Sequence, residues 1–158
     1  YFRRDIVNPV QVKSRLWHLD PEDRKVLKVI IYLNKVDENN GAFEYIPQAF
    51  TSKIASSLKY RYGYVQDKTM EKVISPAHFK FCKGVAGTVI LASTGSVFHR
   101  GKTPTSSDRY TVFFDYTSRK PIVHHYGASF LRDEQLRILS KNLTPEQKEC
   151  VFWKDNFW

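Results

Sequence analysis

Cysteines, long apolar runs and targeting signals are what this sequence has least of. Its 158 residues include two cysteines, Cys82 and Cys150, which are too few and too far apart for a disulfide framework or a zinc cluster. No apolar run is long enough to cross a membrane, and no secretory signal sequence is visible. Internal repeats and low-complexity tracts are absent as well. We therefore expect a cytoplasmic protein that works in a reducing compartment and does not enter a membrane.

Acidic residues are outnumbered by basic ones, 16 against 25, which gives a net charge of +9. Basic domains often bind nucleic acids, and residues 59–64 interleave cations with tyrosines as single-strand binders do. The simpler interpretation is that the lysines keep a small domain soluble and that Tyr60 to Tyr64 pack a loop. A cationic lid over a pocket for an anionic substrate is a third interpretation of the same segment.

Most of the chain has the pattern of β-strands. Segments rich in β-branched and aromatic residues predict strands at residues 26–33, 42–46, 87–92 and 109–116. Turn residues that end on Gly41, which is free to adopt a positive φ, predict a hairpin between the first two strands. Thr144, Pro145 and Gln147 are typical of a capped helix start, and the leucines before them predict another short helix. We expect one mainly-β domain, residues 1–158, with short helices near its C-terminus.

The triplet His18-Leu19-Asp20 is the most informative feature of the chain. Side chains two residues apart on a strand point the same way, so His18 and Asp20 share one face while Trp17 and Leu19 share the other. A histidine from a distant strand would complete a set of two imidazoles and one carboxylate. Those are the usual protein ligands of non-haem Fe(II), and they leave positions open for substrate and dioxygen. Because His-x-Asp also occurs by chance, the prediction depends on the rest of the chain.

His99 and Arg109 supply the context that the triplet needs. His99 lies just past a turn, on or beside the next strand, and Arg109 begins a further strand ten residues later. Arg109, Thr111 and Phe113 lie on one face of that strand, where an arginine could fork two hydrogen bonds onto a carboxylate. The Thr111 hydroxyl could bind the same carboxylate, and Lys28 could reach the same pocket. This spacing favours an iron enzyme whose co-substrate is a dicarboxylate.

Several motifs follow one another in a fixed order. They are Trp17-His18-Leu19-Asp20, Asn40-Gly41-Ala42-Phe43-Glu44-Tyr45-Ile46-Pro47, Gly87-Thr88-Val89, Phe98-His99-Arg100-Gly101 and Arg109. In this order they resemble the phytanoyl-CoA dioxygenase-like proteins, which belong to the Fe(II)/2-oxoglutarate oxygenases. The resemblance runs from about residue 14 to about residue 119 and implies a double-stranded β-helix, or jelly roll. It also implies iron held by His18, Asp20 and His99, with Arg109 on the distal carboxylate of 2-oxoglutarate.

The resemblance implies a hydroxylase. Its cofactors would be Fe(II), 2-oxoglutarate and dioxygen. Its products would be succinate, CO2 and a hydroxylated small organic molecule. A cationic lid over the pocket would suit an anionic substrate. Halogenases of this superfamily lack the carboxylate ligand, so Asp20 favours hydroxylation. The chain departs from the family at Gln48-Ala49-Phe50, where Gly-Ser-His commonly follows the proline, and at Ser93, where aspartate is common. Neither position is a metal ligand, but the first lies beside the pocket, so the choice of substrate stays open.

Three other functions share parts of this pattern. An AlkB-type nucleic-acid demethylase would use the same metal ligands, but that group has a second arginine six residues after the first, where this chain has Asp115. A non-catalytic jelly-roll binding module would use metal only to join strands and would have no use for Arg109. A cupin-like isomerase or sugar-binding protein would have a site richer in histidine. Fold alone does not separate these alternatives.

The other histidines and tyrosines have simpler interpretations. His78 is the rival third ligand, but it lacks the strand pattern that flanks His99. His124 and His125 are adjacent and would point to opposite faces of a strand, so both cannot join one site. Tyr32 and Tyr45 could line the pocket, although packing in the core explains them better.

The two ends of the chain carry further expectations. Jelly-roll oxygenases usually have helices ahead of the first metal ligand, so we expect this chain to be the C-terminal part of a longer protein. At the other end, Phe152, Trp153, Phe157 and Trp158 are typical of residues that anchor a tail. A homodimer formed through this apolar tail is an alternative.

Overall fold

The structure is a computed structural model of the chain, and it describes residues 1–7, 10–118, 121–123 and 132–152. The chain divides into two compact units, Tyr1–Ile122 and Val123–Trp158, and each is described by itself. The first unit holds every described strand together with helices α1 and α2, and the second holds helices α3 and α4. A single domain over residues 1–158 stays a prediction.

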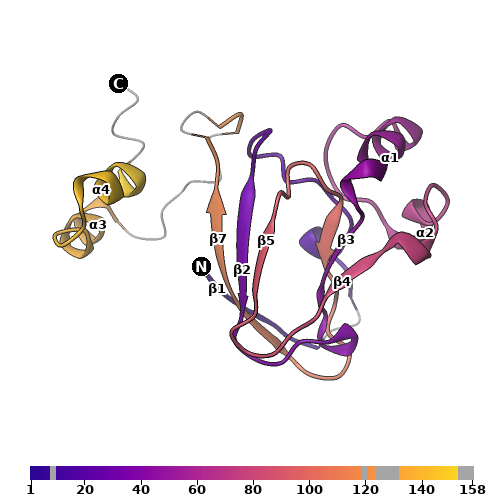
Figure 1. Cartoon of the computed structure of the whole chain (residues 1–158), viewed down its shortest axis with the longest axis horizontal. Helices are drawn as coiled ribbons and strands as arrows, with labels where there is room; N and C mark the ends of the chain where they lie inside the picture. The colour runs from indigo at the N-terminus through magenta and orange to yellow at the C-terminus, as the bar shows by residue number, and fades with distance from the viewer. Residues whose placement is uncertain (8–9, 119–120, 124–131, 153–158) are drawn as a thin grey trace. The chain divides into compact units, whose positions relative to one another are not determined.

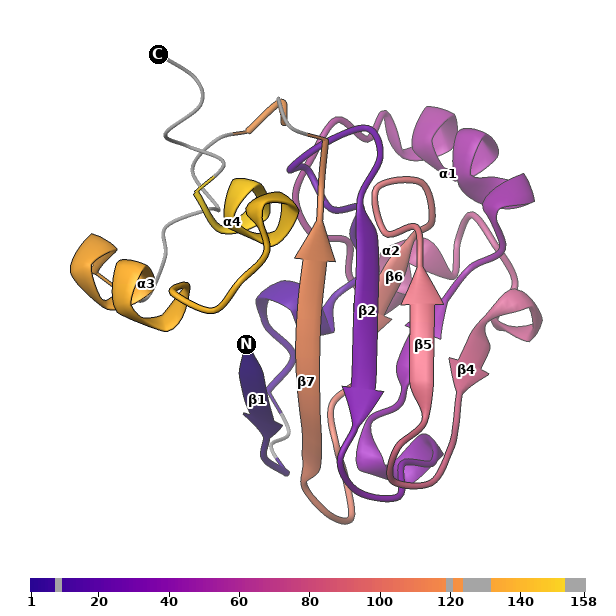
Figure 2. The same ribbon diagram turned by 60° about the vertical axis from the view of Figure 1, so that its left-hand side comes forward.

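The described strands of the first unit form two antiparallel sheets (Figures 1 and 2). The first sheet has the order β1-β7-β2-β5 and the second the order β4-β3-β6. The strand bounds are Phe2–Asp5 (β1), Leu27–Tyr32 (β2), Phe43–Tyr45 (β3), Lys80–Cys82 (β4), Val89–Ala92 (β5), His99–Gly101 (β6) and Arg109–Tyr116 (β7). The predicted mainly-β class is therefore confirmed.

The chain changes sheet at most of its connections. After β1 in the first sheet, His18 forms a bridge with His99 at the edge of the second, and β2 returns to the first. Strands β3 and β4 belong to the second sheet, β5 to the first, β6 to the second and β7 to the first. Such alternation between two antiparallel sheets agrees with the jelly roll that the family resemblance implies. The double-stranded β-helix stays our interpretation of this topology.

The prediction that β2 and β3 form a hairpin is wrong. Strand β2 pairs with β5 and β7, whereas β3 pairs with β4 and β6. The turn itself is where it was expected, because Asp37 caps a short 3-10 helix, Glu38–Asn40, and Gly41 adopts φ +75°. This turn carries the chain from one sheet to the other. The same turn residues can form either a hairpin within one sheet or a connection between two sheets.

Two clusters of buried side chains separate the layers of the first unit. One lies between the sheets and consists of Ile30, Tyr32, Val36, Ala42, Phe43 and Phe113. The other lies between the second sheet and the helices α1 (Thr51–Leu58) and α2 (Asp67–Met70), and consists of Trp17, Ile46, Ile54, Val65, Met70, Ile74 and Phe98. Figure 1 shows both helices beyond β3 and β4, on the side away from the first sheet. The second sheet is therefore covered on both faces.

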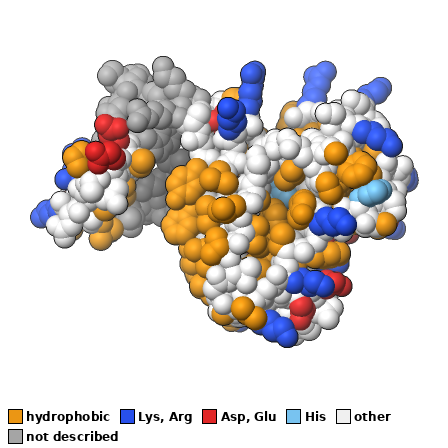
Figure 3. All heavy atoms as spheres, in the orientation of Figure 1, with side chains coloured by type: hydrophobic (Ala, Val, Ile, Leu, Met, Phe, Trp, Pro, Cys, Tyr) orange, Lys and Arg blue, Asp and Glu red, His pale blue; other side chains and the backbone are white. Residues whose placement is uncertain are grey.

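The first sheet has an apolar outer face. Alternation along its strands turns Lys28, Ile30 and Phe113 inward and leaves several large apolar side chains exposed. These are Leu27, Val89, Leu91, Phe114 and Tyr116. Figure 3 shows a broad gathering of hydrophobic side chains on the molecular surface.

The described part of the second unit contains two short helices, α3 (Asp133–Leu139) and α4 (Pro145–Val151). Helix α4 begins as predicted, since Thr144 caps it and Gln147 completes the capping box. His124, His125 and the tail residues 153–158 lie outside the described residues, so the homodimer through that tail stays a prediction. None of the described helices combines the length and the apolar character that spanning a membrane requires.

Candidate metal centre

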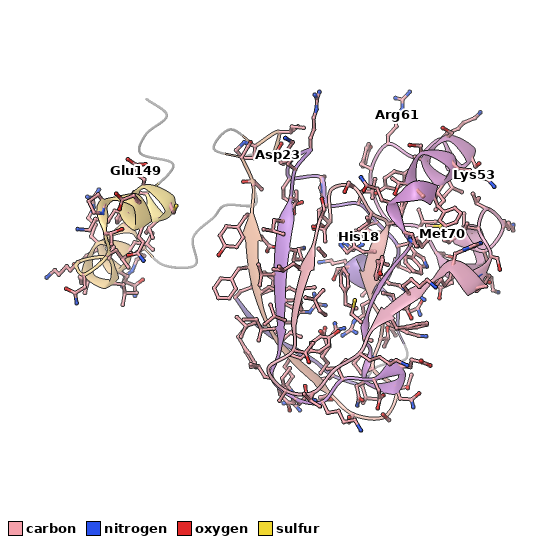
Figure 4. The ribbon with its side chains drawn as sticks, in the orientation of Figure 1. His18, Asp23, Lys53, Arg61, Met70 and Glu149 are labelled. Atoms are coloured by element: carbon pink, nitrogen blue, oxygen red, sulfur yellow. The ribbon has the colours of Figure 1, made fainter. Side chains whose placement is uncertain are left out.

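His18, Asp20 and His99 converge in the first unit, and all three are buried. One potential ligand atom of each lies within 4.8 Å of the others. The Nε2 atoms of His18 and His99 are 3.4 and 3.5 Å from the same oxygen of Asp20, Oδ1. In Figure 4, His18 lies between the two sheets. The predicted metal ligands are therefore brought together from segments about 80 residues apart.

Backbone hydrogen bonds place the two histidines side by side. His18 and His99 form a reciprocal antiparallel bridge, with N–O distances of 3.1 and 3.0 Å. Residues directly opposite in an antiparallel pair have neighbouring side chains, and the two ring centroids lie 4.3 Å apart. Trp17 meanwhile packs on the opposite face, in the cluster below the helices. The prediction that His18 and Trp17 face opposite ways is confirmed.

A backbone carbonyl oxygen orients each histidine ring. His18 Nδ1 lies 2.8 Å from the Leu16 carbonyl oxygen, and His99 Nδ1 lies 3.0 Å from that of Val97. Because a carbonyl oxygen only accepts, each Nδ1 donates to it, and Nε2 is the ring nitrogen that faces Asp20. This is how metal-binding histidines are commonly oriented. A metal ion bound here would replace any proton on Nε2.

Asp20 is held ionised although it is buried. Burial alone would raise the pKa of this carboxyl, but the imidazoles of His18 and His99 and the charge of Lys28 lower it well below its usual range. Lys28 Nζ is 2.8 Å from Asp20 Oδ2, as an ion pair without the angles of a hydrogen bond. Burial also lowers the pKa of His99, which favours its neutral, ligand-competent form.

The donor set fits a non-haem iron ion. Imidazole nitrogens and carboxylate oxygens bind divalent metals at about 2 Å, so ligands at adjacent positions lie roughly 3 Å apart. The distances of 3.4 and 3.5 Å from Asp20 to the two histidines are close to that value. Two imidazoles and one carboxylate are also the set that suits Fe(II) rather than a structural zinc ion.

A small cavity of about 50 Å3 lies beside the three ligands, between the sheets. The cavity wall includes His18 and His99 together with the cationic side chains of Arg3, Lys28 and Arg109. Apolar and aromatic side chains also line it, namely Tyr1, Ile30, Phe43 and Phe113. The predicted iron ligands and the predicted carboxylate clamp therefore border one space.

Arg109 has a carboxylate partner within the chain itself. Its Nε and Nη2 atoms donate to Asp5 Oδ2, at 3.1 and 2.6 Å, and its Nη1 atom donates to the Gly41 carbonyl. Thr111 lies on the same inward face, but its hydroxyl is directed at the Arg3 carbonyl and does not line the cavity. The structure thus brings Arg109 to the site and leaves Thr111 out of the cavity wall.

The segment 60–64 borders the site. The Tyr60 hydroxyl accepts from the Leu19 backbone and donates to the Gly63 carbonyl, so this tyrosine packs as a loop residue would. The Tyr64 ring meets the His18 ring edge-on, with centroids 5.2 Å apart. An open cleft of about 280 Å3 runs between residues 60–62 and Asp20. A lid function for this segment stays a prediction.

A buried ion-pair network holds the strands on either side of the two histidines. Arg100 follows His99 and pairs with Glu44 of β3 and with Asp67 of α2. Its guanidinium also lies 4.4 Å from the ring of Trp17, which precedes His18. No local sequence pattern predicts this network, because its members are distant in the chain.

The remaining candidates do not line the cavity. The His78 ring lies tilted against that of Phe50, with centroids 4.5 Å apart, and is half-buried. Tyr32 is buried in the core, where burial raises its pKa to about 12, and Tyr45 packs against the same cluster. Their assignment to the core is confirmed. The functional residue that sequence reasoning missed is Asp5, which sits in a short segment without a strand pattern.

No protein-family model matches the sequence, and no curated protein matches it by sequence. Among solved structures, the chain is similar to the non-heme monooxygenase ThoJ in its apo form, at 18% sequence identity and a TM-score of 0.47. The similarity covers 77% of this chain and 46% of ThoJ. The chain therefore spans less than half the length of that protein.

Proposed function

We propose that this chain is the core of a non-haem iron hydroxylase that uses 2-oxoglutarate and resembles the phytanoyl-CoA dioxygenase-like oxygenases. The observation that carries the proposal is the convergence of two imidazoles and one carboxylate beside a cavity lined by cations. When Fe(II) and 2-oxoglutarate are bound, they supply the oxidation, which consumes dioxygen, releases succinate and CO2 and hydroxylates a C–H bond of the substrate.

The chain's own residues hold and shield the reactants. His18 and His99 present Nε2, and Asp20 presents a carboxylate that is paired with Lys28. Arg109 is the proposed partner of the distal carboxylate of 2-oxoglutarate, because its planar fork matches a carboxylate. Ile30, Phe43 and Phe113 form the apolar part of the wall, which keeps water away from the reacting groups.

The cleft beside Asp20 supports a small, anionic primary substrate. Its lining includes Arg24, Arg61 and the rings of Tyr60 and Tyr62, together with the carboxylates of Asp20 and Asp23. Arginines favour an anionic group, and the rings provide apolar contact area. Small molecules that carry a carboxylate or a phosphate are therefore the first substrates to screen.

A metal that merely joins strands is the less favoured alternative. His18 and His99 are already joined by two backbone hydrogen bonds, so the strands need no metal to hold them together. A structural site would also have no use for the cationic cavity on one side of the ligands.

The test is an anaerobic titration with Fe(II) and 2-oxoglutarate, monitored by the weak visible charge-transfer band of their chelate. We expect the band in the wild-type protein, its loss in Asp20→Ala and a much higher 2-oxoglutarate requirement in Arg109→Ala. Iron binding without any band in the wild-type protein would rule out the 2-oxoglutarate assignment and favour the binding module.

A further inference from the structure

Three arginines surround a single buried carboxylate at the inner end of β1. Asp5 is 1% exposed and contacts Arg3, Arg15 and Arg109. The cluster therefore carries three positive charges and one negative charge. Arg15 Nη1 is buried and has no hydrogen-bond partner among the described residues. Of these four residues, Arg3 and Arg109 line the cavity, so its wall borders a cluster with an excess of positive charge and of hydrogen-bond donors.

The two oxygens of Asp5 have different partners. Oδ1 accepts from Arg3 Nε at 2.7 Å and from Arg15 Nη2 at 2.9 Å. Oδ2 accepts only from Arg109 among the described residues, through Nε and Nη2. Asp5 can therefore release Arg109 while Arg3 and Arg15 still hold its other oxygen. Arg109 would likewise stay anchored by the hydrogen bond from Nη1 to the Gly41 carbonyl.

We propose that Asp5 is an internal, exchangeable occupant of the carboxylate site on Arg109, and that a dicarboxylate ligand binds by displacing Asp5 Oδ2 from that arginine. The ligand's far carboxylate then takes the two donors that Asp5 gives up. The inference rests on the proposed function in that 2-oxoglutarate is the dicarboxylate concerned.

The charges of the cluster make this exchange favourable. An arginine buried without a partner is strongly destabilising, so Asp5 stabilises the ligand-free site. With both Asp5 and a ligand carboxylate present, the cluster holds three positive and two negative charges and remains net positive. The second anion is therefore attracted rather than repelled.

Exchange lowers the affinity for the ligand. The apparent dissociation constant equals the intrinsic one divided by the fraction of chains in which Arg109 is free of Asp5. The cavity of about 50 Å3 is also smaller than ordinary ligand pockets, so entry of a five-carbon acid requires side chains to move. Tyr1, about half exposed, and Arg3 line the cavity and are placed to do so.

The experiment measures glutarate binding to the metal-free protein by calorimetry, comparing the wild type with Asp5→Asn. Glutarate has the two carboxylates of 2-oxoglutarate and lacks its keto group, so it reports on the arginine site without iron. We expect Asp5→Asn to bind glutarate about tenfold more tightly, because Asn competes less well for Arg109. Adding Arg109→Gln to Asp5→Asn should remove the gain.

Asp108→Asn is the matched control. It breaks the exposed pair between Asp108 and Arg4, which joins the same two segments at the surface, and it should leave glutarate binding unchanged. Equal or weaker binding by Asp5→Asn would overturn the exchange. If 2-oxoglutarate is nevertheless consumed, the proposed function stands without it. If Asp5→Asn binds glutarate more tightly through Arg109 but the protein binds no iron, the exchange stands and the oxygenase function is rejected.

The wild-type protein provides a second test if Asp5→Asn does not fold. In a ¹⁵N-labelled sample, saturating glutarate should shift the Nε–H resonance of Arg109, whose bond to Asp5 is replaced. The Nε–H resonance of Arg3, which is bonded to the other oxygen of Asp5, should move little. An unchanged Arg109 resonance at saturation would overturn the exchange.

Discussion

Two buried carboxylates, Asp5 and Asp20, each have a pKa that is lowered by the side chains around them. Burial alone would raise the pKa of Asp5, but Arg109, Arg3 and Arg15 lower it below its usual value. At Asp20 the two imidazoles and Lys28 have the same effect. The first carboxylate closes the ligand-free arginine site, and the second is positioned to bind metal.

The lowered pKa of Asp5 predicts how stability depends on pH. Its folded-state pKa lies below its unfolded value, so its stabilising effect is complete above the unfolded pKa and is lost as the pH falls through the folded pKa. Asp5→Asn should lower the free energy of unfolding by about 3 kcal/mol at neutral pH, the effect of breaking a buried ion pair. The difference from the wild type should shrink below about pH 4. Urea unfolding of both proteins from pH 7 to pH 2.5 measures it, and a difference that stays constant over that range would contradict the pairing.

At the residue scale the metal ligands could be predicted and their partners could not. His18 and Asp20 follow a strand period, and His99 completes a known ligand set, but the order of the surrounding motifs and the family resemblance were needed to select them. Arg109 was expected at the cavity and lies there, but Asp5 is 104 residues away. No local pattern connects residues at that separation.

At the scale of the element, the turn before β3 supports the arginine site. Gly41 has φ +75°, and an added Cβ would lie 2.7 Å from the Pro104 nitrogen and against the Lys102 carbonyl. Its own carbonyl accepts from Arg109. A change in this turn therefore disturbs the sheet-to-sheet connection and the anchor of Arg109 together.

Gly41→Ala should be clearly more destabilising than Gly63→Ala. Both glycines have a positive φ, but a Cβ at Gly63 meets nothing within 4 Å. Gly63→Ala should cost about 1 kcal/mol from the backbone alone, and the overlap at Gly41 should add roughly 1–3 kcal/mol. Urea unfolding midpoints compare the two variants, and equal losses would show that the close approach around Gly41 has no energetic effect.

There are physical reasons why some elements could not be predicted from the sequence. In β1, the polar Arg3 and Asp5 turn inward and the apolar Phe2 turns outward, so a search for an apolar inner face passes over it. The wrong hairpin arose because turn residues indicate where the chain reverses, not which sheet the next strand joins. Strand β7 was found correctly, since its buried and exposed residues alternate in the usual way.

At the scale of the whole molecule, several cations are internal. Lys28, Arg15, Arg100 and Arg109 are largely buried and each pairs with a carboxylate. Because these pairs nearly cancel, most of the net charge of +9 lies outside them. The net charge alone therefore does not separate a nucleic-acid partner from a small anionic ligand.

The most direct test of the account is stoichiometric Fe(II) binding under anaerobic conditions in the wild type, His99→Ala and His78→Ala. The wild type and His78→Ala should each bind one Fe(II) per chain, because the His78 ring lies against that of Phe50 and does not line the cavity. His99→Ala should bind at least about 100-fold more weakly, since it loses a direct ligand. Unchanged binding by His99→Ala, or its loss in His78→Ala, would contradict the metal centre proposed for His18, Asp20 and His99.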